Sequence, residues 1–160
     1  MAVDMFMKLD GVKGESADKT YKDQIDVLAW SWGASNSGSA HVAKGAGTGK
    51  VNVQDLSFTK YLDAATPDLL LACCNGKHFP KAMLIVRKAG ESPVEYLKIS
   101  MDEVLVSSIS TGGSGGEDRL TENVTFNFAK VKVEYTGQTE KGGKGKTATM
   151  GWDIAAGVKA

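Results

Sequence analysis

The chain carries no excess of either charge, because 19 lysine and arginine residues balance 19 aspartate and glutamate residues among its 160 residues. A protein that binds nucleic acid through phosphates needs a basic excess, so the balance argues against that partner. The local basic segment at residues 141–146 is short and glycine-rich, and we expect a solvated loop there. The length predicts one domain over residues 1–160.

Long hydrophobic runs are also missing. No stretch approaches the 18 apolar residues of a membrane-spanning helix, so we expect no membrane insertion. Asp4 and Lys8 interrupt the apolar residues near the start, so no uninterrupted signal-peptide core is formed. We expect a cytoplasmic protein that leaves the cell only by a route that accepts the folded chain.

Cysteine and histidine occur only twice each, which limits the available chemistry. Cys73 and Cys74 are adjacent, and neighbouring cysteines rarely form an unstrained disulfide or a zinc site without further ligands. We interpret them as buried free thiols. His41 and His78 stand in no metal-binding spacing, and Cys74 with His78 is a weak nucleophile–base pair because the helix is expected to end between them. We predict no metal, no cofactor and no enzymatic activity.

Two glycine-rich segments resemble a phosphate-binding P-loop only in part. Residues 45–50 end in Gly-Lys, but Lys44 occupies the first glycine position and Val51 the Ser/Thr position. Residues 145–147, Gly-Lys-Thr, match the end of the P-loop motif, but Glu140 occupies the position of its first glycine. A P-loop also needs a helix after it, whereas both segments precede strand-like sequence. We therefore do not expect nucleotide binding.

What the sequence does contain is strand-like alternation. Val124, Phe126 and Phe128 alternate with Thr125 and Asn127, the period of a half-buried strand. At three places in the strand-like sequence, the alternation of apolar and polar residues shifts by one residue, so that the apolar side chains change face. These places are near 54–55, between 101 and 104, and between 128 and 131. A β-bulge is the usual cause, and bent strands of this kind turn the corners of barrels. The predicted fold class is therefore mainly β, a bent-strand β-barrel of two sheets.

One short flanking α-helix is expected, from about Pro67 to Asn75. Thr66 is a suitable N-cap, Pro67 suits the first helical position, and Asn75-Gly76 supplies the stop. The body of the helix, L-L-L-A-C-C, is apolar on every side, whereas a surface helix needs one apolar stripe. We expect cover from the barrel and from a neighbouring subunit; the alternative is a helix that plugs one end of the barrel.

Residues 107–128 combine a glycine hinge, the charged triplet Glu117-Asp118-Arg119 and the start of a strand. This stretch resembles the haemolysin-coregulated protein (Hcp) family, whose members form the tube of the bacterial type VI secretion system. The resemblance extends to V-D-M-F at 3–6, D-V-L-A-W-S-W-G at 26–33, V-N-V-Q-D-L-S-F-T-K-Y at 51–61 and G-K-H at 76–78. It is weakest over residues 136–160.

The resemblance implies a structural protein. Six copies would close into a ring, and rings would stack into an inner tube whose lumen carries and stabilises effector proteins. The implied partners are further copies of the chain, effector proteins, and the spike, sheath and baseplate proteins. Secretion would then need no signal peptide. The alternative function is a non-polymerising ring or barrel that acts as a specialised cargo-binding carrier.

Three sets of residues are candidates for these contacts. The resemblance places Ser31 on the inner wall, and alternation agrees, because Trp30 and Trp32 share the opposite face; the alternative is a serine packed between sheets. The triplet Glu117, Asp118 and Arg119 is the candidate ring interface, with a metal site or a local turn contact as alternatives.

The candidate stacking element is the glycine-rich loop over residues 36–50, represented by Gly45, Gly47, Gly49 and Lys50. A loop of this length without structure of its own is unusual and often functional. Residues 11–21 are the alternative stacking loop.

Overall fold

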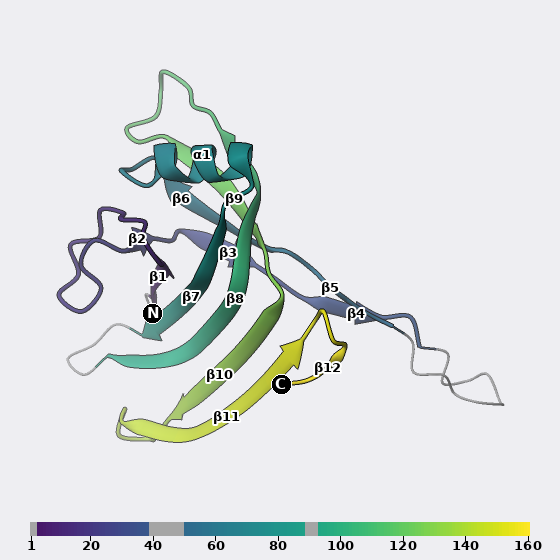
Figure 1. Cartoon of the computed structure of the whole chain (residues 1–160). Coiled ribbons are helices and arrows are strands. Elements are labelled where there is room, and N and C mark those ends of the chain that lie inside the picture. Colours follow the sequence, from purple (N-terminus) through teal and green to yellow (C-terminus); the bar gives the residue numbers. More distant parts are fainter. Residues whose placement is uncertain (1–2, 39–49, 89–92) are drawn as a thin grey trace.

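The computed structural model describes residues 3–38, 50–88 and 93–160, and within them the chain forms twelve strands and one helix (Figure 1). In chain order these are β1 (Val3–Leu9), β2 (Ile25–Asp26), β3 (Ala29–Ser31), β4 (Ala34–Asn36), β5 (Val51–Val53), β6 (Leu56–Tyr61), α1 (Thr66–Asn75), β7 (His78–Lys88), β8 (Val94–Thr111), β9 (Thr121–Asn127), β10 (Lys130–Gln138), β11 (Lys144–Asp153) and β12 (Val158–Lys159). The predicted mainly β fold with one short helix is confirmed.

A ten-stranded sheet curls around the core, with the long strand β8 at its centre. Beyond the C-terminal part of β8, the sheet continues through β9 and β6 to β3. On the other edge, β8 pairs with β7, β7 with β1, and β1 with β2. The segment after β2 closes the barrel, because the Val27 amide donates to the Met5 carbonyl at 3.0 Å and the Leu28 amide donates to the Thr59 carbonyl at 2.8 Å.

The N-terminal part of β8 carries a second extension, which we call the wing: strands β10, β11 and β12. β10 pairs with residues 97–102 of β8, β11 with β10, and β12 with β11. β9 and β10 follow each other along the same edge of β8, so residues 128–129 mark the junction of barrel and wing. The wing and α1 lie at opposite ends of the molecule (Figure 1).

The bend in β8 is fixed by Glu103, whose φ of 54° lies in the left-handed region. Ile99 and Met101 are buried before it, and Val104 and Val106 after it, so the phase changes at this residue, as predicted. The other two predicted slips fall between β5 and β6 and between β9 and β10. The register shifts of the described strands lie elsewhere, so the bulges that we expected are not the cause.

The core fills the barrel and extends under α1. Phe58 and Phe126 meet edge to face, with ring centroids 5.1 Å apart. Leu69 and Ala72 are the buried residues of α1. Other fully buried side chains come from β1, β6, β7 and β8 and include Met7, Leu56, Leu84, Ile85, Ile99 and Met101. Each fully buried side chain of this size contributes about 1.5–3 kcal/mol relative to an exposed one.

The ends of α1 agree only in part with the prediction. Gly76 ends the helix with a φ of 68°, the left-handed conformation that glycine adopts without a Cβ clash. The N-cap prediction for Thr66 is wrong: Ala65 occupies the cap position and makes no side-chain cap hydrogen bond. The hydroxyl of Thr66 takes part in a buried ion cluster instead. The described residues contain no helix that could cross a membrane.

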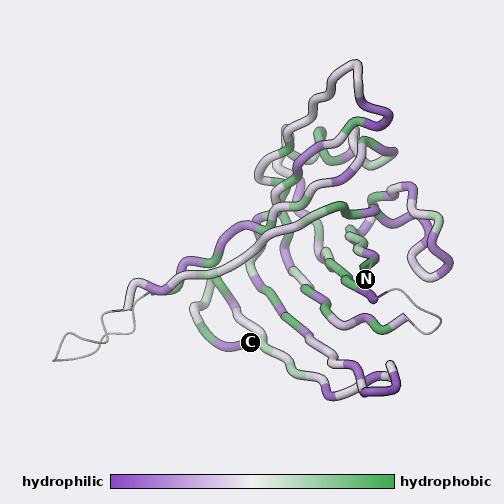
Figure 2. Tube along the Cα trace, turned by 180° about the vertical axis from the view of Figure 1, so that it is seen from behind, coloured by the Kyte–Doolittle hydropathy of each residue, from purple (hydrophilic) through white to green (hydrophobic). Residues whose placement is uncertain are grey.

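Two further segments leave the barrel. β4 and β5 pair as a separate two-stranded sheet that extends away from the rest of the chain (Figure 1). The turn between β10 and β11 spans residues 139–143, because β10 continues to Gln138 and β11 begins at Lys144. The hydrophilic residues of this region gather at that turn (Figure 2). The solvated loop expected at 141–146 is therefore partly a strand.

Candidate assembly surfaces

The outer face of β3, β6, β9 and the end of β8 carries short side chains without charge. Residues paired across these four strands form two transverse rows, which we call the polar rows. One row is Ser31–Ser57–Thr125–Ser108 and the other is Ala29–Thr59–Asn123–Ser110. This face is a smooth polar wall, and it places Ser31 beside other small residues.

Hydrogen bonds hold the side chains of the polar rows in place. The Thr59 hydroxyl donates to the Asn123 amide oxygen at 2.7 Å, and the hydroxyls of Ser57 and Thr125 lie 3.2 Å apart. Ser31 is exposed, while Trp30 beside it is half-buried against the core. The opposite orientation of serine and tryptophan follows the predicted alternation. A serine packed between sheets is contradicted by the exposure of Ser31.

Beneath this wall, β6 and β9 bury an ion cluster under the start of α1. The ammonium of Lys60 pairs with the carboxylate of Glu122 and lies 2.9 Å from a carboxylate oxygen of Asp63. The Thr66 hydroxyl donates to Glu122 at 2.7 Å. The side chains of Lys60 and Glu122 are fully buried. Ions removed from water in this way stabilise a fold only while they remain paired.

The loop after β8 presents the predicted triplet at the surface. Glu117, Asp118 and Arg119 are all exposed in the chain described here. The guanidinium of Arg119 lies 3.8 Å from the ring centroid of Tyr61, at the end of β6. This cation–π contact, together with the hydrogen bond from the Leu62 amide to the Leu120 carbonyl, ties the end of the loop to the chain that leads into α1.

Helix α1 buries one side only within the single chain. Leu70 and Leu71 are 40% and 62% exposed, and Leu120 beside the triplet is 38% exposed. Cys73 is half-buried and Cys74 is exposed, both as free thiols. The prediction of two buried thiols is therefore wrong for Cys74, because the core contacts of the helix come from Leu69 and Ala72.

The wing also leaves apolar side chains in solvent. Tyr135 and Met150 are 51% and 48% exposed. Tyr135 pairs with Leu97, and Met150 with Val133, which in turn pairs with buried Ile99. The same face of the sheet that lines the barrel interior thus continues onto the wing without cover from its own chain.

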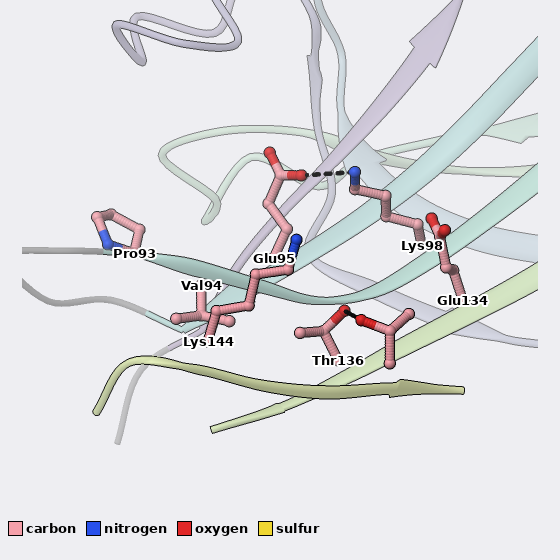
Figure 3. Close-up of a pocket in the computed structure, with 8 residues that line it drawn as sticks. Pro93, Val94, Glu95, Lys98, Glu134, Thr136 and Lys144 are labelled. Carbon is pink, nitrogen blue, oxygen red and sulfur yellow. Dashed lines mark hydrogen bonds and ion pairs between the residues drawn. The ribbon is translucent and has the colours of Figure 1, made fainter. Parts of the chain in front are cut away.

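The opposite, charged side of the wing holds a groove (Figure 3). Glu95 and Lys98 form an ion pair at 2.9 Å, and the hydroxyls of Thr136 and Thr147 lie 3.2 Å apart. The remaining lining residues are Pro93, Val94, Glu134 and Lys144. These groups pair along the strands and do not converge on one point, as a nucleophile, a base and an orienting group would.

The alternative stacking loop, residues 11–21, is anchored by Arg87 of β7. Its guanidinium binds both carboxylate oxygens of Asp18, at 2.5 and 3.2 Å, and lies over the rings of Phe6 and Tyr21. These hydrogen bonds hold the pKa of Asp18 below its ordinary value, although partial burial acts in the opposite direction. The carboxylate of Glu15 also accepts the Ala64 amide at 2.9 Å, so this loop has a defined shape.

The remaining predicted residues are those of the candidate stacking loop and the two histidines. Lys50 is exposed immediately before β5, whereas Gly45, Gly47 and Gly49 lie outside the described residues, as does His41. His78 is exposed at the start of β7, which removes it from any shared helix face with Cys74. In residues 3–38, 50–88 and 93–160, no three His, Cys, Asp or Glu side chains are grouped as metal ligands.

The sequence and the fold of this chain are similar to those of known proteins. The family model described as "Type VI secretion system effector, Hcp" matches residues 6–135. Protein hcp1 of Pseudomonas aeruginosa is 64% identical, with 100% of both chains covered. A solved type six secretion system protein is 33% identical with a TM-score of 0.93, over 99% of this chain and 100% of the other. Hcp1 from Salmonella typhimurium is 39% identical with a TM-score of 0.83, over the whole of both chains.

Proposed function

Because the chain belongs to the Hcp family of type VI secretion proteins, we propose that it is the structural subunit of a hexameric ring and that such rings stack into the inner tube of the secretion machine. The observation that carries the proposal is the pair of polar rows. In these two rows, four strands present short, uncharged side chains on one face, which suits a wall past which other proteins must move. Unlike surfaces on the two sides of a subunit would close the ring.

The lumen would carry effector proteins, and Ser31 would contact them. Replacing Ser31 by Gln inserts a longer amide side chain into one of the polar rows. We expect ring assembly to be unchanged and retention of an effector to fall at least tenfold, because the side chain is exposed and protrudes from an otherwise smooth wall. Size-exclusion chromatography with light scattering measures the ring, and co-purification measures retention. Thr66→Ser, a hydroxyl-retaining change away from the polar rows, is the control. Loss of the ring in Ser31→Gln would place this residue in the subunit interface instead.

The triplet Glu117, Asp118 and Arg119 would set the register between neighbouring subunits, since ordered charges contribute more to specificity than to affinity. We expect Arg119→Glu to weaken ring closure while the monomer stays folded, because all three side chains are exposed. Each exposed ion pair lost contributes about 0–1 kcal/mol, and a buried one several times more. Light scattering over a dilution series measures the change. Lys13→Glu makes the same charge change in the loop before β2, and an equal loss of ring in both variants would assign the effect to net charge alone.

Stacking would use the glycine-rich segment of the sequence between β4 and β5, which contains Gly45, Gly47, Gly49 and Lys50. Ordering a glycine-rich segment costs about 1–2 kcal/mol per residue, so stacking of one ring pair would be weak and many copies would be needed for a persistent tube. The proposed partners are effector, spike, sheath and baseplate proteins. A ring that carries effectors and never stacks would support the carrier function instead.

A further inference from the structure

Five exposed lysines surround a groove on the outer face of the sheet, which we call the lysine groove. These are Lys8, Lys81, Lys130, Lys132 and Lys159. The larger part of the groove, over β7–β12, has a volume of about 500 Å³, and a smaller part of about 120 Å³ lies over β1, β7 and β8. Both parts are lined by Lys81, Ser100 and Asp102, so they form one continuous depression.

Strand pairing explains why these lysines gather on one face. One transverse row of paired residues is Lys8–Met83–Ser100–Lys132. The adjacent row is Lys81–Asp102–Lys130. Residues paired across neighbouring strands share a face, and the intervening residues of the same strands, such as Met7, Leu84 and Met101, are buried in the core. The two rows therefore point away from the core.

The lysines of the groove have few counter-charges. The groove is lined by two acidic side chains, Asp10 and Asp102, and by Ala160, which carries the terminal carboxylate of the chain described here. Lys130 lies 3.8 Å from Asp153. Among the described residues, the other four lysines of the groove form no ion pair with a carboxylate. Neighbouring ammonium groups without counter-charges attract an anion into the groove.

The spacing of the lysines indicates the shape of that anion. Lys8 and Lys132 lie in the same row and are separated by three strand-to-strand steps, which is about 14 Å. A single phosphate group is too small to contact both. An extended peptide of four to five residues covers this distance, at about 3.3 Å per residue. The groove therefore suits an extended ligand that carries several negative charges.

Asp102 distinguishes an acidic peptide from a nucleic acid. This carboxylate lies between Lys81 and Lys130 in its row. A nucleic-acid backbone repeats its phosphates at a fixed interval and would bring negative charge close to Asp102. A peptide can place acidic side chains opposite the lysines and an uncharged side chain opposite Asp102. The zero net charge of the chain also argues against phosphate-driven binding of nucleic acid.

We propose that the lysine groove binds an extended acidic segment of another protein, with Lys81 and Lys132 as the central contacts. The polar rows lie on other strands, β3, β6, β9 and the end of β8, so this partner is distinct from a cargo in the lumen. The proposal concerns the single chain and does not require the ring.

The test uses a fluorescently labelled octaglutamate peptide as the probe, with fluorescence anisotropy as the readout. We expect the unmodified chain to bind the peptide, and Lys81→Glu combined with Lys132→Glu to lower the affinity at least tenfold, because repulsion replaces attraction at two contacts. Lys81→Gln combined with Lys132→Gln removes the charges without reversing them. It is expected to lower the affinity at least threefold and to weaken the dependence of binding on salt.

A matched control makes the same charge change outside the groove. Lys144→Glu combined with Lys146→Glu reverses two exposed lysines at the start of β11, and the affinity is expected to stay within twofold of the unmodified chain. An equal loss of affinity in the control and in the groove variant would assign binding to net charge and overturn the proposal. Circular dichroism and thermal melting establish that each variant is folded, and the Gln variant gives the answer if the Glu variant is not.

Competition experiments separate the acidic peptide from other anions. Inorganic phosphate that displaces the peptide at equal concentration would identify a small-anion site, and duplex DNA that binds as tightly as the peptide would identify a general polyanion surface. Either result overturns the proposal, as does an unmodified chain that does not bind the peptide. Light scattering measures the ring separately, so failure of this proposal leaves the proposed function in place.

Discussion

Replacing Lys60 by Met is expected to lower the free energy of unfolding by about 3–5 kcal/mol. The change leaves the carboxylates of Glu122 and Asp63 without their ammonium partner in the interior. Among the described residues, one carboxylate oxygen of Glu122 already has no hydrogen-bond partner, so the part of the cluster that the structure describes has no spare donor to compensate. Urea denaturation followed by tryptophan fluorescence measures the loss.

A second variant distinguishes pairing from packing. Lys60→Met combined with Glu122→Leu removes both ions of the buried pair, and we expect it to recover at least half of the lost stability, because apolar residues of similar volume replace buried ion pairs well. Lys98→Met, which removes a half-buried ion pair with Glu95 within one strand, is expected to change stability by less than about 1 kcal/mol. A Lys60→Met protein as stable as the Lys98→Met protein would contradict the role given to the cluster.

Replacing Arg87 by Met is expected to lower the free energy of unfolding by about 2–3 kcal/mol at neutral pH. Met retains much of the volume between the rings of Phe6 and Tyr21 but loses the two hydrogen bonds to Asp18 and the one to Asp4. Residues 11–21 should then exchange their backbone amides faster in hydrogen-exchange measurements. Exchange in β6 and β9, neither of which pairs with β7, serves as the internal control.

The same variant should change how stability depends on pH. Hydrogen bonds from Arg87 place the pKa of Asp18 below its ordinary value of 3.8. The carboxylate therefore contributes stability above about pH 4, and the contribution is lost as the pH falls through the lowered pKa. The difference in unfolding free energy between the unmodified chain and Arg87→Met should be constant from pH 7 to 5 and shrink below about pH 4. A difference that does not change with acid would show that Asp18 is not the titrating partner.

Much of the fold follows from alternation alone. The three phase slips identify the bend at Glu103 and the breaks before Leu56 and after Phe128, because a residue must change face when the sheet turns a corner. The exposure of Ser31 follows from the same rule, since the adjacent tryptophans take the inner face.

The predictions that were wrong, and the residues that were missed, involve contacts between parts of the chain that are far apart in the sequence. Thr66 has the right chemistry for a cap, but a buried carboxylate on β9 competes for its hydroxyl, and that partner is 56 residues away in the sequence. Lys60 and Glu122 could have been found, because each continues the inward phase of a strand, after Phe58 and before Val124. Strand-like sequence is predicted for β10, after the shift between residues 128 and 131, and it continues into β11. That these strands extend beyond the barrel with one face uncovered does not follow from the alternation.

The polar rows have a consequence for motion. Successive rows are two residues apart along each strand, a spacing of about 6.6 Å. In the tube proposed above, a protein that moves from one polar row to the other would meet hydroxyl and amide groups again, with no charged side chain in either row. The interaction energy of such a protein would change little between the two rows. The polar rows of the proposed tube would then not select cargo by its charge.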